Sequence, residues 1–117
     1  MSFDISIERR DAETFVISVA GDLDLRTAPD LKVHSLEAVE SGGREVILDL
    51  TETTFIDSTA LGAIVGGVKR LRSIDGELAL VCSDRSIVRI FQITGLDRII
   101  PMHRSLHTAL SSTPVAV

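Results

Sequence analysis

The chain has 117 residues, of which 44% are hydrophobic and 3% aromatic, and its net charge at pH 7 is −5. This length suits one compact domain, and the hydrophobic content argues against intrinsic disorder. The negative charge argues against nucleic acid or an anionic membrane as the partner, because both require a basic surface. The scarcity of aromatic residues argues against stacking platforms for bases or sugars.

The sequence also indicates a compartment. Cys82 is the only cysteine, so no internal disulfide can form and a reducing environment is expected. The first residues show no basic segment followed by an apolar run, which argues against a signal peptide. No stretch approaches the roughly 18 consecutive apolar residues of a membrane span. We therefore expect a cytoplasmic protein that does not bind membranes.

The first half of the chain predicts three strands and one helix. Alternating or β-branched apolar residues favour strands, whereas a capping residue followed by apolar residues at helical spacing favours a helix. In chain order these elements are a strand over 3–7, a strand over 14–20, a helix from Thr27 to the Gly42-Gly43 stop, and a strand over 45–50. The first two strands are expected to form a hairpin, and Gly21-Asp22-Leu23-Asp24 is expected to end the second.

The second half predicts helices that alternate with strands. In chain order we expect a helix from Asp57-Ser58 to about Ser73, a strand over 77–82, a helix from Ser83 or Asp84 to Gly95, a short edge strand at Ile99-Ile100 ended by Pro101, and a helix over 105–111. The buried stripe of the first of these helices is expected to comprise Leu61, Ile64, Val65, Val68 and Leu71.

This order of elements predicts the fold class. Strands that alternate with helices after an opening hairpin indicate an α/β domain with a mixed sheet and right-handed crossovers. We expect a single domain over residues 1–112, with four or five strands and about four helices, followed by a loose tail over 113–117.

The segment 55–62 (FIDSTALG) is the most informative about function. Asp, Ser and Thr in series also meet the ordinary need for a helix N-cap, so these residue types alone do not indicate a site. The outer face of the predicted helix is less ordinary, because it carries small, uncharged residues where a solvent face usually carries Glu, Lys or Gln. These residues are Thr59, Gly62, Ala63 and Gly66.

Two explanations fit the glycines on this face. Each glycine costs about 1 kcal/mol relative to alanine inside a helix. Either a partner backbone approaches the face closely, or the glycines allow tight packing within the domain, which suits the flanking Gly67 better. Ser58 is predicted at the border between the buried stripe and the outer face, where a kinase could reach it. A phosphate there would add about −1.5 to −2 charges beside Asp57.

These motifs resemble those of the STAS-domain anti-sigma factor antagonists of bacteria. The helix of that family begins with Asp-Ser-[Ser/Thr]-Gly-Leu, which residues 57–61 match at four of five positions, with Ala60 in place of Gly. Gly21-Asp22-Leu23-Asp24 resembles the family's second motif, which closes its second strand. Thr94-Gly95-Leu96 and the segment from Ser105 to Leu110 are also similar, so the resemblance covers nearly the whole chain.

The resemblance implies a function in partner switching. The unphosphorylated protein would bind an anti-sigma factor that is also a serine kinase, and this binding would release the sigma factor. The kinase would phosphorylate Ser58, or alternatively Thr59, and the complex would dissociate; a PP2C-like phosphatase would reverse the modification. The chain itself would be a monomer when free, without enzymatic activity, cofactor or metal, and ATP would belong to the partner. The partner-binding residues implied in this way are Asp22, Asp24, Asp57, Thr59, Gly62, Ala63 and Gly66.

Three other functions are alternatives to this one. Within the family, the chain could be a STAS docking subunit of another assembly, such as a stress-signalling complex or a lipid-transport system, in which Ser58 is not phosphorylated. A receiver-like domain phosphorylated on Asp57 would need an acidic pair after the first strand, and Ile7-Glu8-Arg9 does not supply one. A hydrolase using Ser58 as nucleophile would need an activating base, and no histidine lies near it in the sequence.

The remaining candidate residues favour structural roles. His103 and His107 are four residues apart, but without an evident third ligand they are expected to be surface histidines rather than metal ligands. Cys82 ends an apolar strand and is expected to be a buried structural thiol. The basic residues 69, 70 and 72 are expected to complement the dipole at the end of their helix.

Overall fold

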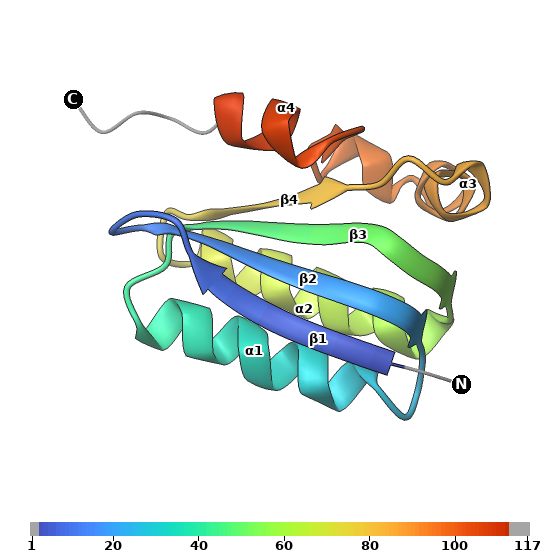
Figure 1. Ribbon diagram of the computed structural model, residues 1–117, viewed down its shortest axis with the longest axis horizontal. Coiled ribbons are helices and arrows are strands. Elements are labelled where there is room, and N and C mark those ends of the chain that lie inside the picture. The colour runs from blue at the N-terminus through green and yellow to red at the C-terminus, as the bar shows by residue number, and fades with distance from the viewer. Residues whose placement is uncertain (1–2, 113–117) are drawn as a thin grey trace.

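The computed structural model describes residues 3–112, so the tail predicted over 113–117 lies outside the described residues. Its elements follow the predicted order closely (Figure 1). They are β1 (Phe3–Arg9), β2 (Thr14–Leu23), α1 (Ala28–Glu40), β3 (Glu45–Ile56), α2 (Ser58–Arg72), β4 (Glu77–Val81), α3 (Arg85–Thr94), a 3-10 helix η1 (Leu96–Arg98), β5 (Met102–His103) and α4 (Leu106–Ser111).

The strands form one mixed sheet in the order β1-β2-β3-β4-β5. β1 and β2 are an antiparallel hairpin, and each later neighbour is parallel. Parallel neighbours require a crossover, which α1 supplies between β2 and β3 and α2 supplies between β3 and β4. The prediction of an α/β domain with a mixed sheet and about four helices is therefore confirmed.

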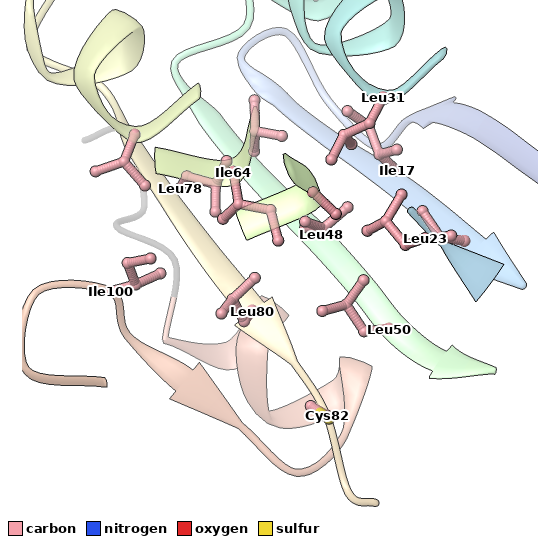
Figure 2. Packing of buried hydrophobic residues seen from close by; sticks show 14 of the residues in the cluster. Ile17, Leu23, Leu31, Leu48, Leu50, Ile64, Leu78, Leu80, Cys82 and Ile100 are labelled. Carbon is pink, nitrogen blue, oxygen red and sulfur yellow. The ribbon is translucent and has the colours of Figure 1, made fainter. Parts of the chain in front are cut away.

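The main core lies on the face of the sheet that α1 and α2 cover (Figures 1 and 2). Every second residue of the central strands points into it, together with the buried stripes of the helices and two side chains of α3, Ile87 and Phe91. A smaller cluster on the other face joins Val16, Ile47 and Val81 to Ala109 of α4. None of the helices in the described part of the chain is long and apolar enough to cross a membrane.

β2 and β3 are longer than predicted. The Gly21-Asp22-Leu23 segment belongs to β2 instead of ending it, and β3 continues to Ile56 rather than stopping at Leu50. The extensions pair with each other, since Asp22 lies opposite Phe55 and Leu23 opposite Ile56. Two register shifts interrupt this pairing, one of them directly after Gly21, whose φ of +92° suits a bulge. The bulges break the regular alternation of side chains, so the extension could not be predicted from the alternation of apolar and polar residues.

The edge strand predicted at Ile99-Ile100 is wrong. The strand β5 follows Pro101 instead, while residues 96–98 form η1 and Ile100 is buried in the core. Proline has no N–H to donate, but its carbonyl can accept a hydrogen bond, so it can precede an edge strand as well as end one. The Leu80 N–H donates to the Pro101 carbonyl at 2.8 Å, and the Cys82 N–H to the His103 carbonyl at 2.9 Å.

The helix boundaries were predicted within one or two residues, but the buried stripe of α2 is shifted. Its buried residues are Ala60, Ile64, Gly67, Val68 and Leu71. Leu61 and Val65 were predicted in the stripe and are only half-buried. β4 also ends at Val81, one residue before the predicted end. The buried face of α2 is therefore rotated, by about the angle between successive residues, toward Ala60 and Gly67. These small residues let α2 approach the sheet closely.

Candidate functional site

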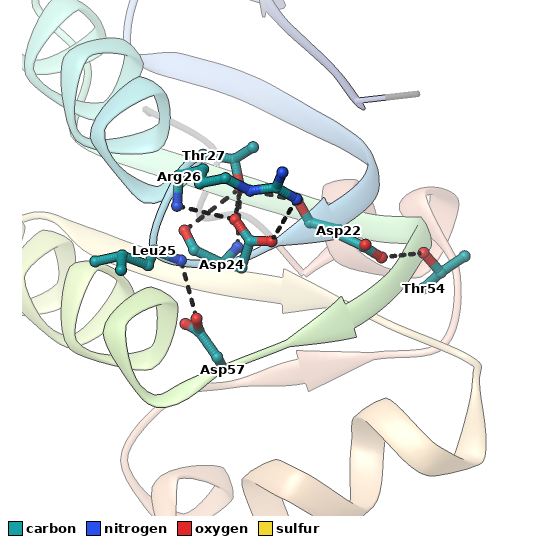
Figure 3. A network of polar contacts seen from close by, with 7 residues as sticks. All are labelled: Asp22, Asp24, Leu25, Arg26, Thr27, Thr54 and Asp57. Atoms are coloured by element: carbon teal, nitrogen blue, oxygen red, sulfur yellow. Dashed lines mark hydrogen bonds and ion pairs between the residues drawn. The ribbon is translucent and has the colours of Figure 1, made fainter. Parts of the chain in front are cut away.

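The site is built around Asp57, the N-cap of α2. One carboxylate oxygen, Oδ1, accepts a hydrogen bond from the Ala60 N–H at 2.9 Å, which satisfies a free donor of the first helical turn. The other oxygen, Oδ2, accepts from the Leu25 N–H at 2.9 Å, as Figure 3 shows. The capping function expected of this residue is therefore confirmed, and the same side chain also holds the loop between β2 and α1 against the start of α2.

That loop is stabilised by its own polar contacts (Figure 3). The Thr27 hydroxyl donates to the Asp22 carbonyl and accepts from the Asp24 N–H, both at 2.8 Å. Thr27 is the N-cap of α1 as predicted, although its side chain makes these loop contacts rather than a capping bond. The network fixes the path of the chain between β2 and α1, and so the position of Leu25.

Asp22 and Asp24 use their carboxylates within this region. Asp22 accepts a hydrogen bond from the Thr54 hydroxyl at 3.0 Å. Asp24 accepts from the Arg26 N–H at 2.9 Å and forms an ion pair with the Arg26 guanidinium at 3.4 Å. Desolvation acts to raise the pKa of Asp24, but the hydrogen bonds and charge of Arg26 outweigh it and leave the pKa lowered. Both side chains are half-buried, so they shape the loop beside α2.

Ser58 is the first residue of α2, and its side chain is exposed. Within residues 3–112, its hydroxyl has no hydrogen-bond partner. The residue before it is Asp57, whose carboxylate accepts hydrogen bonds from two backbone N–H groups. The hydroxyl is therefore accessible from solvent and free to react with an external enzyme.

The outer face of α2 comprises Thr59, Gly62, Ala63 and Gly66. Thr59 and Gly62 are exposed, and Ala63 and Gly66 are half-buried. A Cβ atom built at Gly62 or Gly66 would meet no atom within 4 Å, so tight packing within the domain does not explain these two glycines. Gly67 differs, because a Cβ there would lie 3.3 Å from Leu78 Cδ1. The internal-packing explanation is confirmed for Gly67 alone.

The sequence analysis missed two exposed apolar side chains that are linked to the start of α2, Leu25 through a hydrogen bond and Phe55 through the chain. Leu25 is 67% exposed and Phe55 is 51% exposed. Leu25 extends from the loop that Asp57 holds beside the first turn of α2 (Figure 3), and Phe55 lies three residues before Ser58. No alternation signal marked Phe55 as exposed, because it lies two residues after the buried Thr53 in the same strand. We define the docking surface as Leu25, Phe55, Ser58, Thr59, Gly62, Ala63 and Gly66.

The docking surface contains no charged side chain. Positions 58–68 of α2 are uncharged, and the basic residues of this helix are confined to its last turn, where they complement the negative end of the dipole. An apolar, uncharged surface with two protruding side chains and two bare glycines is suited to contact with another protein.

Comparison with known proteins assigns the family. Residues 4–109 match the sequence model of the STAS domain. The chain belongs to the STAS domain family. An anti-sigma-B factor antagonist of Listeria monocytogenes is 42% identical over 101 residues, which are 86% of this chain and 88% of that protein. The protein of the same name from Staphylococcus aureus is 34% identical over 93 residues, 79% of this chain and 86% of that one.

A solved structure agrees with the assignment. The crystal structure of an anti-sigma factor antagonist from Mycobacterium paratuberculosis superposes with a TM-score of 0.85 at 27% identity, and covers 95% of this chain and 93% of that one. The present STAS domain therefore shares this architecture over nearly its full length.

The other candidate residues of this STAS domain do not form a site. His103 lies in β5 and His107 in α4, so they do not share a helix, and residues 3–112 hold no group of three metal-binding side chains. Cys82 is 2% exposed, and burial raises the pKa of its thiol. The expectation that Cys82 is a buried thiol is confirmed.

Proposed function

We propose that this STAS domain is an anti-sigma factor antagonist controlled by phosphorylation of Ser58. Its unphosphorylated form binds an anti-sigma factor that is also a serine kinase, and this binding releases the sigma factor. The observation that carries the proposal is the exposed Ser58 hydroxyl, which has no hydrogen-bond partner among residues 3–112 and belongs to the uncharged docking surface. The names of the Listeria and Staphylococcus relatives support the antagonist role.

The docking surface supplies the means of binding. Gly62 and Gly66 leave the backbone of α2 uncovered, so a partner helix or loop can pack closely against it. Leu25 and Phe55 are exposed and can enter apolar pockets of the partner. Burying a large apolar side chain completely contributes about 1.5–3 kcal/mol, so these two side chains are the expected binding hot spots.

Phosphorylation opposes this binding without unfolding the domain. A phosphate on Ser58 adds about −1.5 to −2 charges at the first residue of α2. The positive end of the helix dipole accommodates an anion there. Docking, however, would then require desolvation of a dianion and its approach to partner carboxylates. A coupling of about 1–3 kcal/mol between phosphate and partner corresponds to a change in affinity of about 5- to 150-fold.

The enzymes of the cycle belong to other chains in this proposal. The anti-sigma factor supplies ATP and the kinase activity, and a PP2C-like phosphatase regenerates the free hydroxyl. This STAS domain contributes the accepting residue and the docking surface and has no catalytic activity. Asp57, Asp22 and Asp24 support the surface by fixing the start of α2 and the neighbouring loop.

Two variants of Ser58 test the proposal. The partner is the protein that the unmodified chain retains from its own cell extract. We expect Ser58→Ala to bind this partner like the wild type. After incubation with the partner and ATP, mass spectrometry should find no phosphate on Ser58→Ala. We expect Ser58→Asp to bind at least about fivefold more weakly by calorimetry, with an unchanged melting temperature. Thr59→Ala is the matched control and should remain phosphorylated.

Equal affinity of the wild type and Ser58→Asp would contradict the switch. Retained phosphorylation in Ser58→Ala, lost in Thr59→Ala, would assign the acceptor to Thr59 instead. Stable binding with no phosphorylation of either residue would favour a STAS docking subunit of another assembly, such as a stress-signalling complex or a lipid-transport system.

A further inference from the structure

A cavity of about 880 Å³ lies between α3 and the segments that flank β5. Arg85 and Arg89 from α3 line it together with Arg104, which follows β5, and with His103. Its volume falls within the range of about 300–1,000 Å³ that is usual for small-molecule sites. None of its lining residues belongs to the docking surface.

The cavity is cationic in a protein that is acidic overall. Three arginines line it, whereas Asp97 is the one acidic residue that residues 3–112 contribute to its lining. Within residues 3–112 the ion pairs are Arg10 with Glu8 and Arg26 with Asp24, so none of the three arginines has an acidic partner there. No hydrogen bond of the described residues involves these guanidinium groups either. Their donors are therefore available to an external anion.

Two of the arginines, Arg85 and Arg89, occupy positions on α3 that are unfavourable without a ligand. Arg85 is the first residue of α3, where the positive end of the dipole disfavours a cation, and Arg89 lies four residues later on the same helix face. Asp84 caps this helix end by accepting hydrogen bonds from two backbone N–H groups. An anion would therefore be bound by the guanidinium groups rather than by the helix terminus.

Apolar groups line the same cavity. Val88 and Met102 are half-buried, and Ile93 is 73% exposed. Guanidinium groups bind carboxylate and phosphate oxygens through paired hydrogen bonds, and a phosphate monoester offers the three arginines three oxygens and about −1.5 to −2 charges. We propose that this arginine-lined cavity binds a small organic phosphate. Its phosphate contacts the three guanidinium groups, and its apolar portion contacts Val88 and Met102. The site goes beyond the proposed function, because it involves neither Ser58 nor the docking surface.

Titration of the full-length, ¹⁵N-labelled chain tests the proposal. Phenyl phosphate, inorganic phosphate and benzyl alcohol are added separately at constant ionic strength, and the amide signals of residues 82–104 are followed. We expect saturable shifts with phenyl phosphate, about tenfold weaker binding of inorganic phosphate, and no saturation with benzyl alcohol. A ten-fold difference corresponds to about 1.4 kcal/mol, the contribution of one charge-assisted hydrogen bond or of modest apolar contact.

Variants locate the binding. Arg89→Gln and Arg104→Gln should each weaken the binding of phenyl phosphate about tenfold. Arg89→Lys should also weaken this binding, because lysine lacks the paired donors of arginine. Lys32→Gln is the charge-matched control, since Lys32 is exposed on α1 outside the cavity, and it should change the affinity less than about twofold. All these side chains are exposed, so an unchanged melting temperature is expected.

Three outcomes would overturn the proposal. The first is the absence of saturable shifts in the amide signals of residues 82–104. The second is a loss of affinity in Lys32→Gln equal to that in the arginine variants, which would indicate nonspecific electrostatic attraction. The third is that a phosphoserine peptide binds more than about tenfold more tightly than phenyl phosphate, because the cavity would then serve a protein partner.

Discussion

Replacing Gly66 with alanine should stabilise the domain, although glycine in a folded protein often resists substitution. Gly66 lies in the interior of α2, and a Cβ atom there would meet nothing within 4 Å. The methyl group therefore causes no steric conflict, and the higher helix propensity of alanine is gained. That gain is about 0.8–1 kcal/mol. For a domain of this size it corresponds to an increase in melting temperature of about 4 °C.

Gly67 provides the matched comparison. A Cβ atom there would lie 3.3 Å from Leu78 Cδ1, so the leucine must move by a few tenths of an ångström. The cost of that movement offsets the gain in helix propensity, and Gly67→Ala should be close to neutral or destabilising. Urea unfolding followed by circular dichroism measures both variants, and the slope of free energy against urea should stay constant.

The same variant separates stability from binding. If a partner packs against the bare backbone of α2, Gly66→Ala should weaken that complex while it stabilises the free domain. A lower unfolding midpoint for Gly66→Ala would refute the reasoning, because it would mean that other parts of the chain cover this face. Higher stability together with unchanged binding would remove Gly66 from the docking surface.

Two further substitutions address individual carboxyl groups. Asp57→Ala should lower the free energy of unfolding by about 1–2 kcal/mol, because the α2 cap is lost, and hydrogen exchange at the Leu25 amide should accelerate. Burial, then the charges of Glu77 and Glu13, raise the pKa of Glu45 above its ordinary 4.5. The folded state therefore binds this proton more tightly than the unfolded state, so the native domain loses stability as the pH rises through the raised pKa. Glu45→Gln should be more stable than the wild type at pH 7, by less than about 1 kcal/mol given partial exposure. The difference should vanish as the pH falls below about 4.5, and a constant difference between pH 4 and 7 would contradict this origin.

Local patterns predicted most of the fold, and the errors occur where tertiary pairing overrides them. The hairpin, the crossover helices and the final helix carry turn, cap and periodicity signals that act within a few residues. The ends of β2 and β3 are stabilised by pairing between residues more than 30 positions apart, through a bulged register. The position of β5 likewise depends on hydrogen bonds to β4, which the sequence around Pro101 does not encode.

The candidate site, too, was predicted only where its residues are close together in the sequence. Ser58 and the small residues of α2 follow one another at helical spacing, so the sequence alone placed them on one face. Leu25 was missed because its position depends on a hydrogen bond from its N–H to Asp57, 32 residues away. Phe55 was missed because the predicted strand ended at residue 50. Asp22 and Asp24 remain predicted docking residues, and the structure adds that their carboxylates accept hydrogen bonds from Thr54 and Arg26.

The two hydrogen bonds of Asp57 also limit which residues could replace it. Serine, threonine and asparagine cap helices about as well as aspartate does. Each of them, however, offers a single oxygen, and only a carboxylate presents two acceptors on a short side chain. A substitute could begin the helix normally and still release the neighbouring loop, so a well-folded variant could lose the placement of Leu25 without any change in helix content.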